Sequence, residues 1–459
     1  MQRTDYNYNF GPDCSNLRIK SRRKAVVPLL AESYLGAQND LKRQRGRTDV
    51  ENNVLSRETP IRSGKCRSHT PIHYAYLLAA MFALSIVGTG AQTLIVTGPV
   101  AIASPTPVGD VHIREGGVLT VIGPNGNVTG TPNPVWQIGD VSGTQNPLTG
   151  TGTLDIVQGG IVTLKSKGEL DLGTAADATG IVLISDPNSK LTVDGTVNIG
   201  FVKPSEGGMG KVTIENGGEL AANQIVSNSG LATLTLNGGT ISALANSNDF
   251  ISNIPTIMLG QGGGIINSNG NNIANGNNIV ISSPFSDLPI PGTSPVRFEP
   301  GSLIKVGAGT LTLNGNNTFT GGMFMREGTL LAAVPTALGA GDVFLQGGTL
   351  ATTSFVSTGV SHLPHGLTTG KASTINVTGS YVQTGGVLAL GIGGMLGSEY
   401  DHVQFGNTVG LGGTLYATSL NGFRPVAGDR FALLQTTNAP RSENRIRGIF
   451  RSGRLDLER

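Results

Sequence analysis

The chain has 459 residues, a formal net charge of +2, and only 5% aromatic and 14% charged residues. Its 68 glycines are about double the usual share, while Val, Ile and Leu remain frequent. This composition excludes ordinary disorder, which combines few apolar residues with a high net charge, and it argues against a large compact core, which normally contains more aromatic mass.

The first 70 residues are basic, with 14 Lys or Arg against 7 Asp or Glu, and they show no hydrophobic periodicity. We predict that residues 1–70 are a disordered basic leader; translation from a start further in is the alternative that the sequence leaves open. The run RIKSRRK, from Arg18 to Lys24, is of the kind that contacts nucleic acid. It lacks interleaved aromatic residues and a binding fold, so we expect no nucleic acid among the partners.

An apolar run follows the basic leader. The segment YAYLLAAMFALSIV, from Tyr74 to Val87, stands between basic residues and the small residues GTGA, which is the layout of a secretory signal. It is shorter than the roughly 20 apolar residues that a membrane span needs. We predict that residues 71–91 hold the hydrophobic region and cleavage site of a signal peptide, cut between Ala91 and Gln92. A retained anchor and a buried strand or helix are the alternatives.

Both cysteines, Cys14 and Cys66, precede the predicted cut. The exported chain then contains no disulfide, so stacked, hydrogen-bonded coils must hold it together.

Units of the form strand, Gly-Gly, strand recur after the cut. Within each unit apolar and polar residues alternate, as in a half-buried strand, and the glycines allow a sharp corner. The pairs that begin at Gly217 and Gly238 lie 21 residues apart, although other spacings fit poorly. We predict an all-β fold, a right-handed parallel β-helix (solenoid) with imperfect coils of about 21 residues, with insertions and no exact period. The units are GTLDIVQGGIVTL from Gly152, GKVTIENGGELAA from Gly210, ATLTLNGGTISAL from Ala232, GDVFLQGGTLATT from Gly341 and GSYVQTGGVLALG from Gly379.

Residues 92–300 are predicted to form irregular coils. The low-complexity stretch from Gly262 to Asn278 could be a linker, but its regularly placed isoleucines favour coil turns with stacked Asn side chains. A Pro-rich break at 284–300 must lie outside any central strand, because proline cannot donate to the ladder. We expect a lateral loop or a break in the solenoid there. The isoleucines are Ile265, Ile266, Ile273 and Ile279.

The stretch GAGTLTLNGNNTFTGG, residues 307–322, is predicted to be one coil. Leu311 and Leu313 alternate with threonines and should point inward. The residues Asn314–Asn317 follow at once, and because Asn and Gly reach left-handed backbone conformations readily, we expect them to form the corner.

From Gly301 the sequence resembles a known family. The pattern Lys-x-Gly-x-Gly-Thr-Leu-x-Leu, then Asn-x-Tyr/Phe-x-Gly-Gly, then Gly-Thr-Leu stands at Lys305–Leu313, Asn317–Gly322 and Gly328–Leu330. Residues 301–358 therefore resemble the autotransporter-associated β-strand repeat of bacterial passenger domains, with Met323 where the family usually has Thr. Residues 370–440 resemble the C-terminal β-helix segment of such passengers, and 441–459 are predicted as a charged tail.

The resemblance implies export through the inner membrane to the cell surface, in association with the outer membrane or in the extracellular space. It implies as partners host or bacterial surface glycans or proteins, possibly the chain itself. It also implies an outer-membrane translocator, for which this sequence has no counterpart.

Parallel β-helices include polysaccharide-cleaving enzymes, whose chemistry needs two carboxylates held close together. The acidic residues near predicted strands form no close pair, so we expect solvated outward positions and predict no catalytic residue. They are Asp155, Asp171, Asp194, Glu215 and Glu219.

Metal and cofactor signals are weak. His362 and His365 have a metal-like spacing in SHLPHG, but Pro364 excludes a helix and no further ligand completes a set. The other histidines after the cut, His112 and His402, stand alone. GGMGK at Gly207 lacks the first Gly and the Ser or Thr of a phosphate loop. We expect no metal and no cofactor.

We therefore predict a secreted or cell-surface, passenger-like β-helical protein that is not an enzyme and acts in adhesion or self-aggregation. A β-helical polysaccharide-degrading enzyme and a truncated, non-functional remnant of a longer autotransporter are the alternatives. Clustered carboxylates in a lateral groove would favour the enzyme, and a flat Thr, Asn and Ser face would favour adhesion.

N-terminal sequencing of the exported protein should begin at Gln92, because the small residues before it suit a signal peptidase. An exported protein that still carries Cys66 would contradict this prediction.

Overall fold

The computed structural model describes residues 151–436, apart from 175–177, 201, 204–205, 229–230, 271–275 and 353–370, together with short strands between 84 and 138 and between 445 and 458. All of these belong to the second of two units, His73–Arg459. The predicted basic leader lies outside the described residues. The described residues form strands, turns and bends and no helix, so none of them makes a helix of the length and hydropathy needed to cross a membrane.

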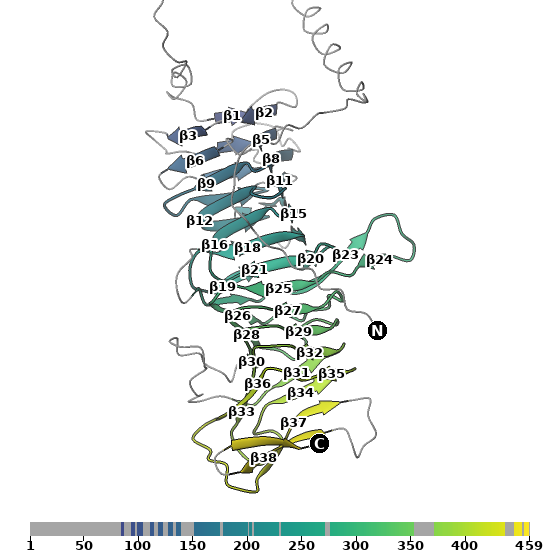
Figure 1. Cartoon of the computed structure of the whole chain (residues 1–459). Coiled ribbons are helices and arrows are strands. Elements are labelled where there is room, and N and C mark those ends of the chain that lie inside the picture. The colour runs from purple at the N-terminus through teal and green to yellow at the C-terminus, as the bar shows by residue number, and fades with distance from the viewer. Residues whose placement is uncertain are drawn as a thin grey trace, which may run out of the picture. The chain divides into compact units, whose positions relative to one another are not determined.

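The strands stack in three parallel ladders, so that each turn of the chain lies on the turn before it (Figure 1). The first ladder is a nine-stranded sheet whose last pair, β23 and β24, is antiparallel. It comprises β2 (Thr93–Val96), β5 (Val118–Ile122), β8 (Thr151–Val157), β11 (Thr179–Ser185), β15 (Met209–Glu215), β17 (Ala232–Asn237), β20 (Ile257–Leu259), β23 (Phe285–Ile290) and β24 (Arg297–Glu299). The predicted all-β parallel β-helix is confirmed.

The second and third ladders together form a 23-stranded sheet, because β12 and β16 are long enough to contribute to both. The second ladder comprises β3 (Pro99–Ala103), β6 (Asn127–Thr131), β9 (Ile161–Leu164), β12 (Lys190–Ile199), β16 (Glu219–Val226), β18 (Gly239–Ala243), β21 (Gly264–Asn267), β25 (Leu303–Val306), β27 (Met323–Met325), β29 (Val343–Leu345), β32 (Tyr381–Gln383) and β35 (Val409–Gly410). The third adds β1 (Leu84–Ile86), β4 (Val111–Ile113), β7 (Val135–Ile138), β10 (Glu169–Leu172), β19 (Ser247–Ser252), β22 (Ile279–Ile281), β26 (Thr310–Leu313), β28 (Thr329–Ala332), β30 (Thr349–Thr352), β33 (Val387–Ile392) and β36 (Thr414–Ser419).

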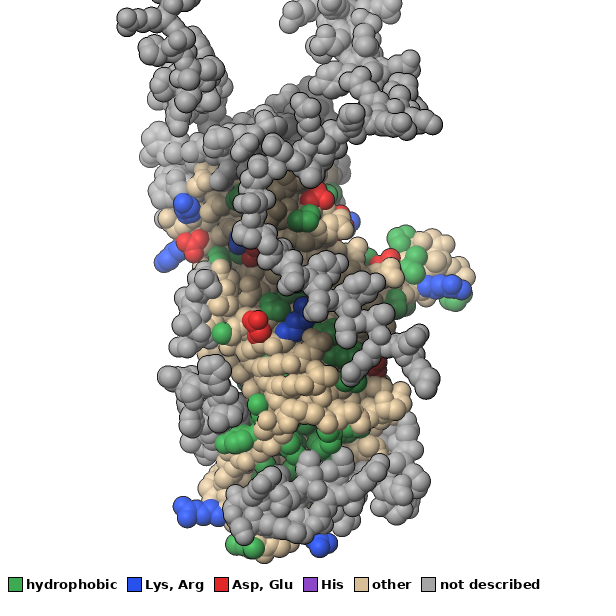
Figure 2. All heavy atoms as spheres, in the orientation of Figure 1, with side chains coloured by type: hydrophobic (Ala, Val, Ile, Leu, Met, Phe, Trp, Pro, Cys, Tyr) green, Lys and Arg blue, Asp and Glu red, His purple; other side chains and the backbone are tan. Residues whose placement is uncertain are grey.

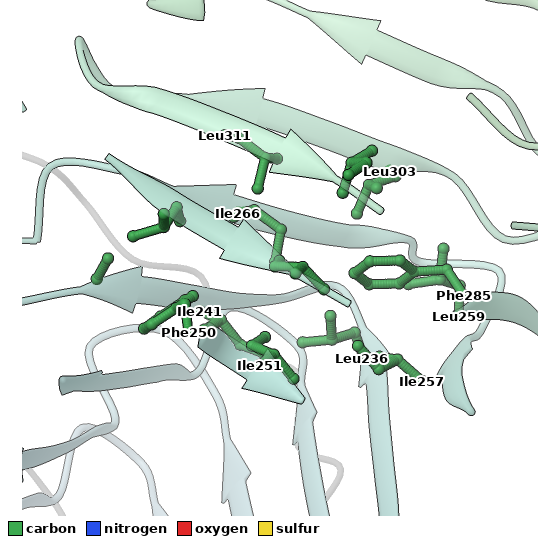
Figure 3. Close-up of a cluster of buried hydrophobic side chains, with 14 of the residues drawn as sticks. Leu236, Ile241, Phe250, Ile251, Ile257, Leu259, Ile266, Phe285, Leu303 and Leu311 are labelled. Atoms are coloured by element: carbon green, nitrogen blue, oxygen red, sulfur yellow. The ribbon is translucent and has the colours of Figure 1, made fainter. Parts of the chain in front are cut away.

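One thin core runs through the coils. Figure 3 shows Leu236, Ile266 and Leu311, one from each ladder, among a cluster of side chains that fill the same interior. Each of the three is fully buried, which stabilises the fold by roughly 1.5–3 kcal/mol per side chain relative to exposure. Because apolar and polar residues alternate along each strand, even a strand of three or four residues places one or two apolar side chains in the core.

Coil length varies along the β-helix, as expected for an imperfect repeat with insertions. Leu303 pairs with Met323 and Met323 with Val343, so these two successive coils are short and equal in length. Leu119 pairs with Leu154, and Ile266 with Lys305, so other coils are almost twice as long. The short coils are close to the predicted length of about 21 residues, and the longer coils carry insertions at corners that join strands which nevertheless stack in register.

The Gly-Gly pairs make corners, as predicted. Gly217 has a φ of +92°, which favours glycine. A Cβ on Gly218 would come within 2.5 Å of the Ile184 carbonyl oxygen in the coil before it. The first glycine turns the chain and the second lets the coils approach.

The Asn corner is different from the prediction. Leu311 and Leu313 point inward and are fully buried, but none of Asn314–Asn317 has a positive φ. Asn317 is instead buried: its side-chain oxygen accepts from Phe285 N at 2.8 Å, and its amide donates to Ala337 O at 2.6 Å. Asn317 follows β26 of the third ladder and bonds to the first residue of β23, so its role is to satisfy backbone groups of neighbouring coils and not to provide backbone freedom.

The stretch from Gly262 to Asn278 forms coil turns where it is described. Ile266 and Ile279 are buried in β21 and β22, whereas Ile265 points outward and Ile273 lies outside the described residues. Asn277 donates from Nδ2 to Ala243 O at 2.7 Å, so its amide bonds to the coil below.

The Pro-rich break is a lateral hairpin. β23 and β24 pair in antiparallel register from Leu288↔Glu299 to Ile290↔Arg297 and project from the side of the coils (Figure 1). Their prolines lie in this projection or at its base, outside the central part of any ladder, as proline requires.

Both ends of the β-helix hold strands where we predicted other structure. β1 lies in the predicted signal segment and pairs in parallel with β4, which matches the strand alternative; the cleavage itself stays a prediction. The predicted charged tail contains two antiparallel strands.

Two smaller sheets complete the described structure. A separate five-stranded sheet comprises β31 (Thr374–Val377), β34 (His402–Phe405), β37 (Arg430–Thr436), β38 (Arg445–Arg451) and β39 (Arg454–Glu458). A two-stranded sheet adds β13 (Val202–Lys203) and β14 (Glu206–Gly207).

Replacing Leu311 by Asp should lower the free energy of unfolding by at least about 3 kcal/mol, because it places an unpaired charge in the core. Replacing the neighbouring outward Thr312 by Asp should cost less than about 1 kcal/mol. Urea unfolding and the rate of limited proteolysis compare the two variants. Equal losses would contradict the inward and outward assignment.

Candidate functional site

The acidic residues that the sequence singled out lie apart and are engaged separately. Asp171 is 3% exposed and accepts from Asn198 Nδ2 at 2.7 Å, so the expectation of a solvated position is wrong for it. Asp194 accepts from Ser166 N at 3.2 Å, and Glu219 pairs with Lys190 at 3.0 Å. Burial raises the pKa of Asp155 on β8. Glu215 ends β15, on the strand side opposite the core.

The other candidates are placed as follows. His402 lies on β34 with its ring 4.6 Å from that of Tyr400. His112 lies on β4, and the pair His362 and His365 lies outside the described residues. The described residues contain no group of three or more His, Cys, Asp or Glu placed to hold a metal ion. The GGMGK segment continues as an extended strand in β15 and does not open a helix, as a phosphate loop does.

The family motif begins with a lysine that the structure buries completely. Lys305 is on the inward side of β25, and four oxygen atoms surround its Nζ. The three N–H groups of Nζ are shared among these oxygens: Ser268 Oγ in the coil before at 2.9 Å, Val306 O and Gly307 O in its own coil at 2.8 and 2.7 Å, and Glu327 O in the next coil at 3.1 Å. One side chain thus connects three consecutive coils.

The surroundings of Lys305 change its pKa. Burial lowers the pKa of Lys305 to about 7, while the Glu327 carboxylate acts in the opposite direction. Glu327 additionally accepts from Gly307 N at 3.1 Å through Oε2. The sequence held a usable signal for this lysine, since it stands two residues after the inward Leu303 and so occupies an inward position of the same strand.

The second ladder, whose inward side carries Lys305, has an apolar stripe on its outward side. The stripe runs over five consecutive strands, and each member is aligned with the next by the strand register. All five side chains are partly exposed. The apolar stripe consists of Ile265, Ile304, Phe324, Phe344 and Val382. Figure 2 shows hydrophobic side chains on the face of the coils that carries β25 to β29.

Two phenylalanines form the centre of the apolar stripe. The rings of Phe324 and Phe344 stack with centroids 4.5 Å apart and an interplanar angle of 7°. Polar groups border them on both sides of the strands: Arg326 Nε donates to Gln346 Oε1 at 3.4 Å, and Asp342 Oδ1 accepts from Ser380 N at 2.7 Å. An apolar centre with a polar rim is the usual anatomy of a protein-binding surface.

The stripe is apolar, and so it is not the flat Thr, Asn and Ser face that we named as favouring adhesion. Earlier strands of the same ladder carry the polar residues Lys190, Glu219 and Thr240 in the corresponding register. From Ile265 onward the position is apolar. The pattern was visible in the sequence as two phenylalanines separated by the length of one short coil.

Comparisons with known proteins agree with the motif. Residues 303–332 match the family described as Passenger-associated-transport-repeat. The chain is 35% identical over 130 residues to a protein named Adhesin BmaC autotransporter, from Brucella suis biovar 1 (strain 1330). The match covers 26% of this chain and 4% of that protein, so the chain spans a small part of the relative's length.

A solved structure is also similar. It is titled as the crystal structure of the TibC-catalyzed hyper-glycosylated TibA55-350 fragment, with 14% sequence identity and a TM-score of 0.33. The similarity covers 73% of this chain and 94% of that one.

Raising the pH from about 7 to about 9 should increase the free energy of unfolding, by an order of 2 kcal/mol from Lys305 alone. In the unfolded chain this lysine titrates near 10.5 and in the folded chain near 7, so in this window the unfolded state binds more protons. Replacing Lys305 by Met should abolish this part of the pH dependence and also destabilise the coils, since the buried oxygens around Nζ lose their shared donor. Thermal unfolding of the wild type and the Lys305→Met variant at several pH values measures the pH dependence of stability. An identical pH dependence in the two proteins would contradict the role of Lys305.

Proposed function

We propose that this chain, a passenger domain of the autotransporter type, is exported to the cell surface or extracellular space and acts there in adhesion. Its repeat at 303–332 and its resemblance to an autotransporter adhesin support this role. The observation that carries the proposal is the apolar stripe, of which Ile304 and Phe324 lie in that repeat.

The physical argument is one of repeated weak contacts. Each coil adds one partly exposed apolar side chain to the stripe at a strand spacing of about 4.8 Å, flanked by polar groups. A ligand or surface that engages several coils gains affinity from many small contributions. Aromatic side chains at the centre of such a surface usually contribute most.

A non-catalytic role agrees with the placement of the acidic residues. In the described part of the chain, Asp171, Asp194 and Glu219 lie on three different strands, and each interacts with a different neighbour. Hydrolysis of a glycoside needs an acid and a second carboxylate facing one substrate bond. Among the described residues, the placement of these carboxylates therefore gives the polysaccharide-degrading alternative no support.

Replacing Phe324 and Phe344 together by Ser should reduce adhesion about tenfold, a loss of roughly 1.4 kcal/mol, because the centre of the apolar stripe is removed. Beads coated with the full chain and counted on cultured epithelial cells give the measurement. The matched control replaces Ile181 and Leu183, a partly exposed apolar pair on the outward side of β11, by Ser. Equal attachment by the wild type and the Phe324/Phe344 variant would overturn the proposal.

The same beads distinguish two ligand classes. Mild periodate treatment of the cells before the assay oxidises surface glycans, and protease treatment removes surface proteins. A loss of attachment after only one treatment assigns the ligand to that class.

A further inference from the structure

We propose that the lateral hairpin is a self-complementary edge, at which β24 pairs with β24 of a second copy of this chain. The inference is independent of the proposed adhesion, because the hairpin lies on the first ladder and the apolar stripe on the second.

The hairpin presents apolar side chains to solvent. Val296 is 59% exposed and Phe298 56%, among the most exposed large apolar residues in the described part of the chain. Phe298 lies at the middle of β24, and Val296 directly precedes the strand. Figure 2 shows hydrophobic and basic side chains on this projection, away from the stacked coils. An exposed strand edge that carries such residues is a template for pairing with another chain.

The backbone of β24 is oriented for such pairing. Phe298 faces Pro289 across the hairpin, and proline has no N–H. This facing pair therefore cannot exchange two hydrogen bonds, so in the alternating antiparallel pattern the N–H and C=O of Phe298 point to the opposite, outer edge. Arg297 N agrees with the alternation, since it donates inward to Thr293 Oγ1 at 2.9 Å.

The hairpin is held firmly at its base. The Asp287 side chain accepts from Gly301 N at 2.8 Å, from Thr320 N at 3.0 Å and from Thr320 Oγ1 at 2.7 Å. Glu299 Oε2 accepts from Gln261 N at 3.1 Å. These contacts fix where the edge is presented, which lowers the entropy lost on association.

The sequence of the edge is complementary to itself. In an antiparallel pair with a two-fold axis at Phe298, the two Phe298 residues face each other and exchange both backbone hydrogen bonds. Arg297 then faces Glu299 of the second copy, and Glu299 faces its Arg297. Opposite charges and aromatic pairs facing across strands each contribute roughly 0.2–1 kcal/mol. The interface is small, so we expect a dissociation constant of roughly 10 μM to 1 mM.

Charge variants test the register. Arg297→Glu places Glu opposite Glu, and Glu299→Arg places Arg opposite Arg and also removes the acceptor of Gln261 N, so each variant alone should dimerise at least tenfold more weakly than the wild type. A mixture of the two should restore dimers, since each chain now complements the other. Sedimentation velocity of the full chains over the stated range measures all three cases. A wild type that stays monomeric at the top of that range, or variants that dimerise like the wild type, would overturn the proposal.

A cross-link provides a readout that does not depend on weak affinity. Facing Cα atoms at a doubly hydrogen-bonded antiparallel position lie about 5.5 Å apart, which a disulfide spans. Phe298→Cys, with Cys14 and Cys66 replaced by Ser, should form a disulfide-linked dimer on mild oxidation. Val426→Cys in the same background, at a residue that is 65% exposed, is the control and should remain monomeric. Equal cross-linking of the two variants would contradict the proposed pairing.

Discussion

Stacking in register is the constraint on which the rest of this structure depends. Each coil must satisfy the backbone groups of the coil before it while placing its inward side chains on the same thin core. Four inward residues that lie in register on successive coils show that this constraint permits different side chains, which may be branched, flexible or aromatic. They are Leu303, Met323, Val343 and Tyr381. Tyr381 fits because its hydroxyl donates to Gln383 Oε1 at 3.3 Å, and burial raises its pKa. The fold therefore requires that an inward position be filled, but it does not require one particular residue type there.

Where the chain leaves a ladder, buried polar side chains take over its hydrogen bonds. Lys305 donates to carbonyls of two coils, Asn317 connects Phe285 N with Ala337 O, and the Asp401 carboxylate accepts from Ser373 N and Gly391 N, both at 2.8 Å. Removing any of them would leave backbone groups buried without partners, which costs more than the net gain of an ordinary hydrogen bond. These side chains explain why a family motif of this kind contains Lys and Asn beside its many glycines.

The sequence predicted what depends on local alternation and missed what depends on neighbours in other coils. The inward Leu311 and Leu313 followed from a period of two alone. Asn317 was assigned to the right corner for the wrong reason, because its partners lie in two other coils, 32 and 20 residues away. The apolar stripe was not predicted, since it exists only once the short coils align Phe324 with Phe344.

The constancy of the ladders despite unequal corners has an evolutionary consequence. The coil that contains the lateral hairpin is almost twice as long as the coil after it, yet Ile265 still pairs with Ile304 and Ile304 with Phe324. An insertion at a corner therefore leaves the stacking of the coils unchanged if the strands before and after it still lie in register, one strand spacing from those of the neighbouring coil. Duplication of a coil and acquisition of a side arm become separate genetic events, so a lineage can change what the protein displays without changing how it is built.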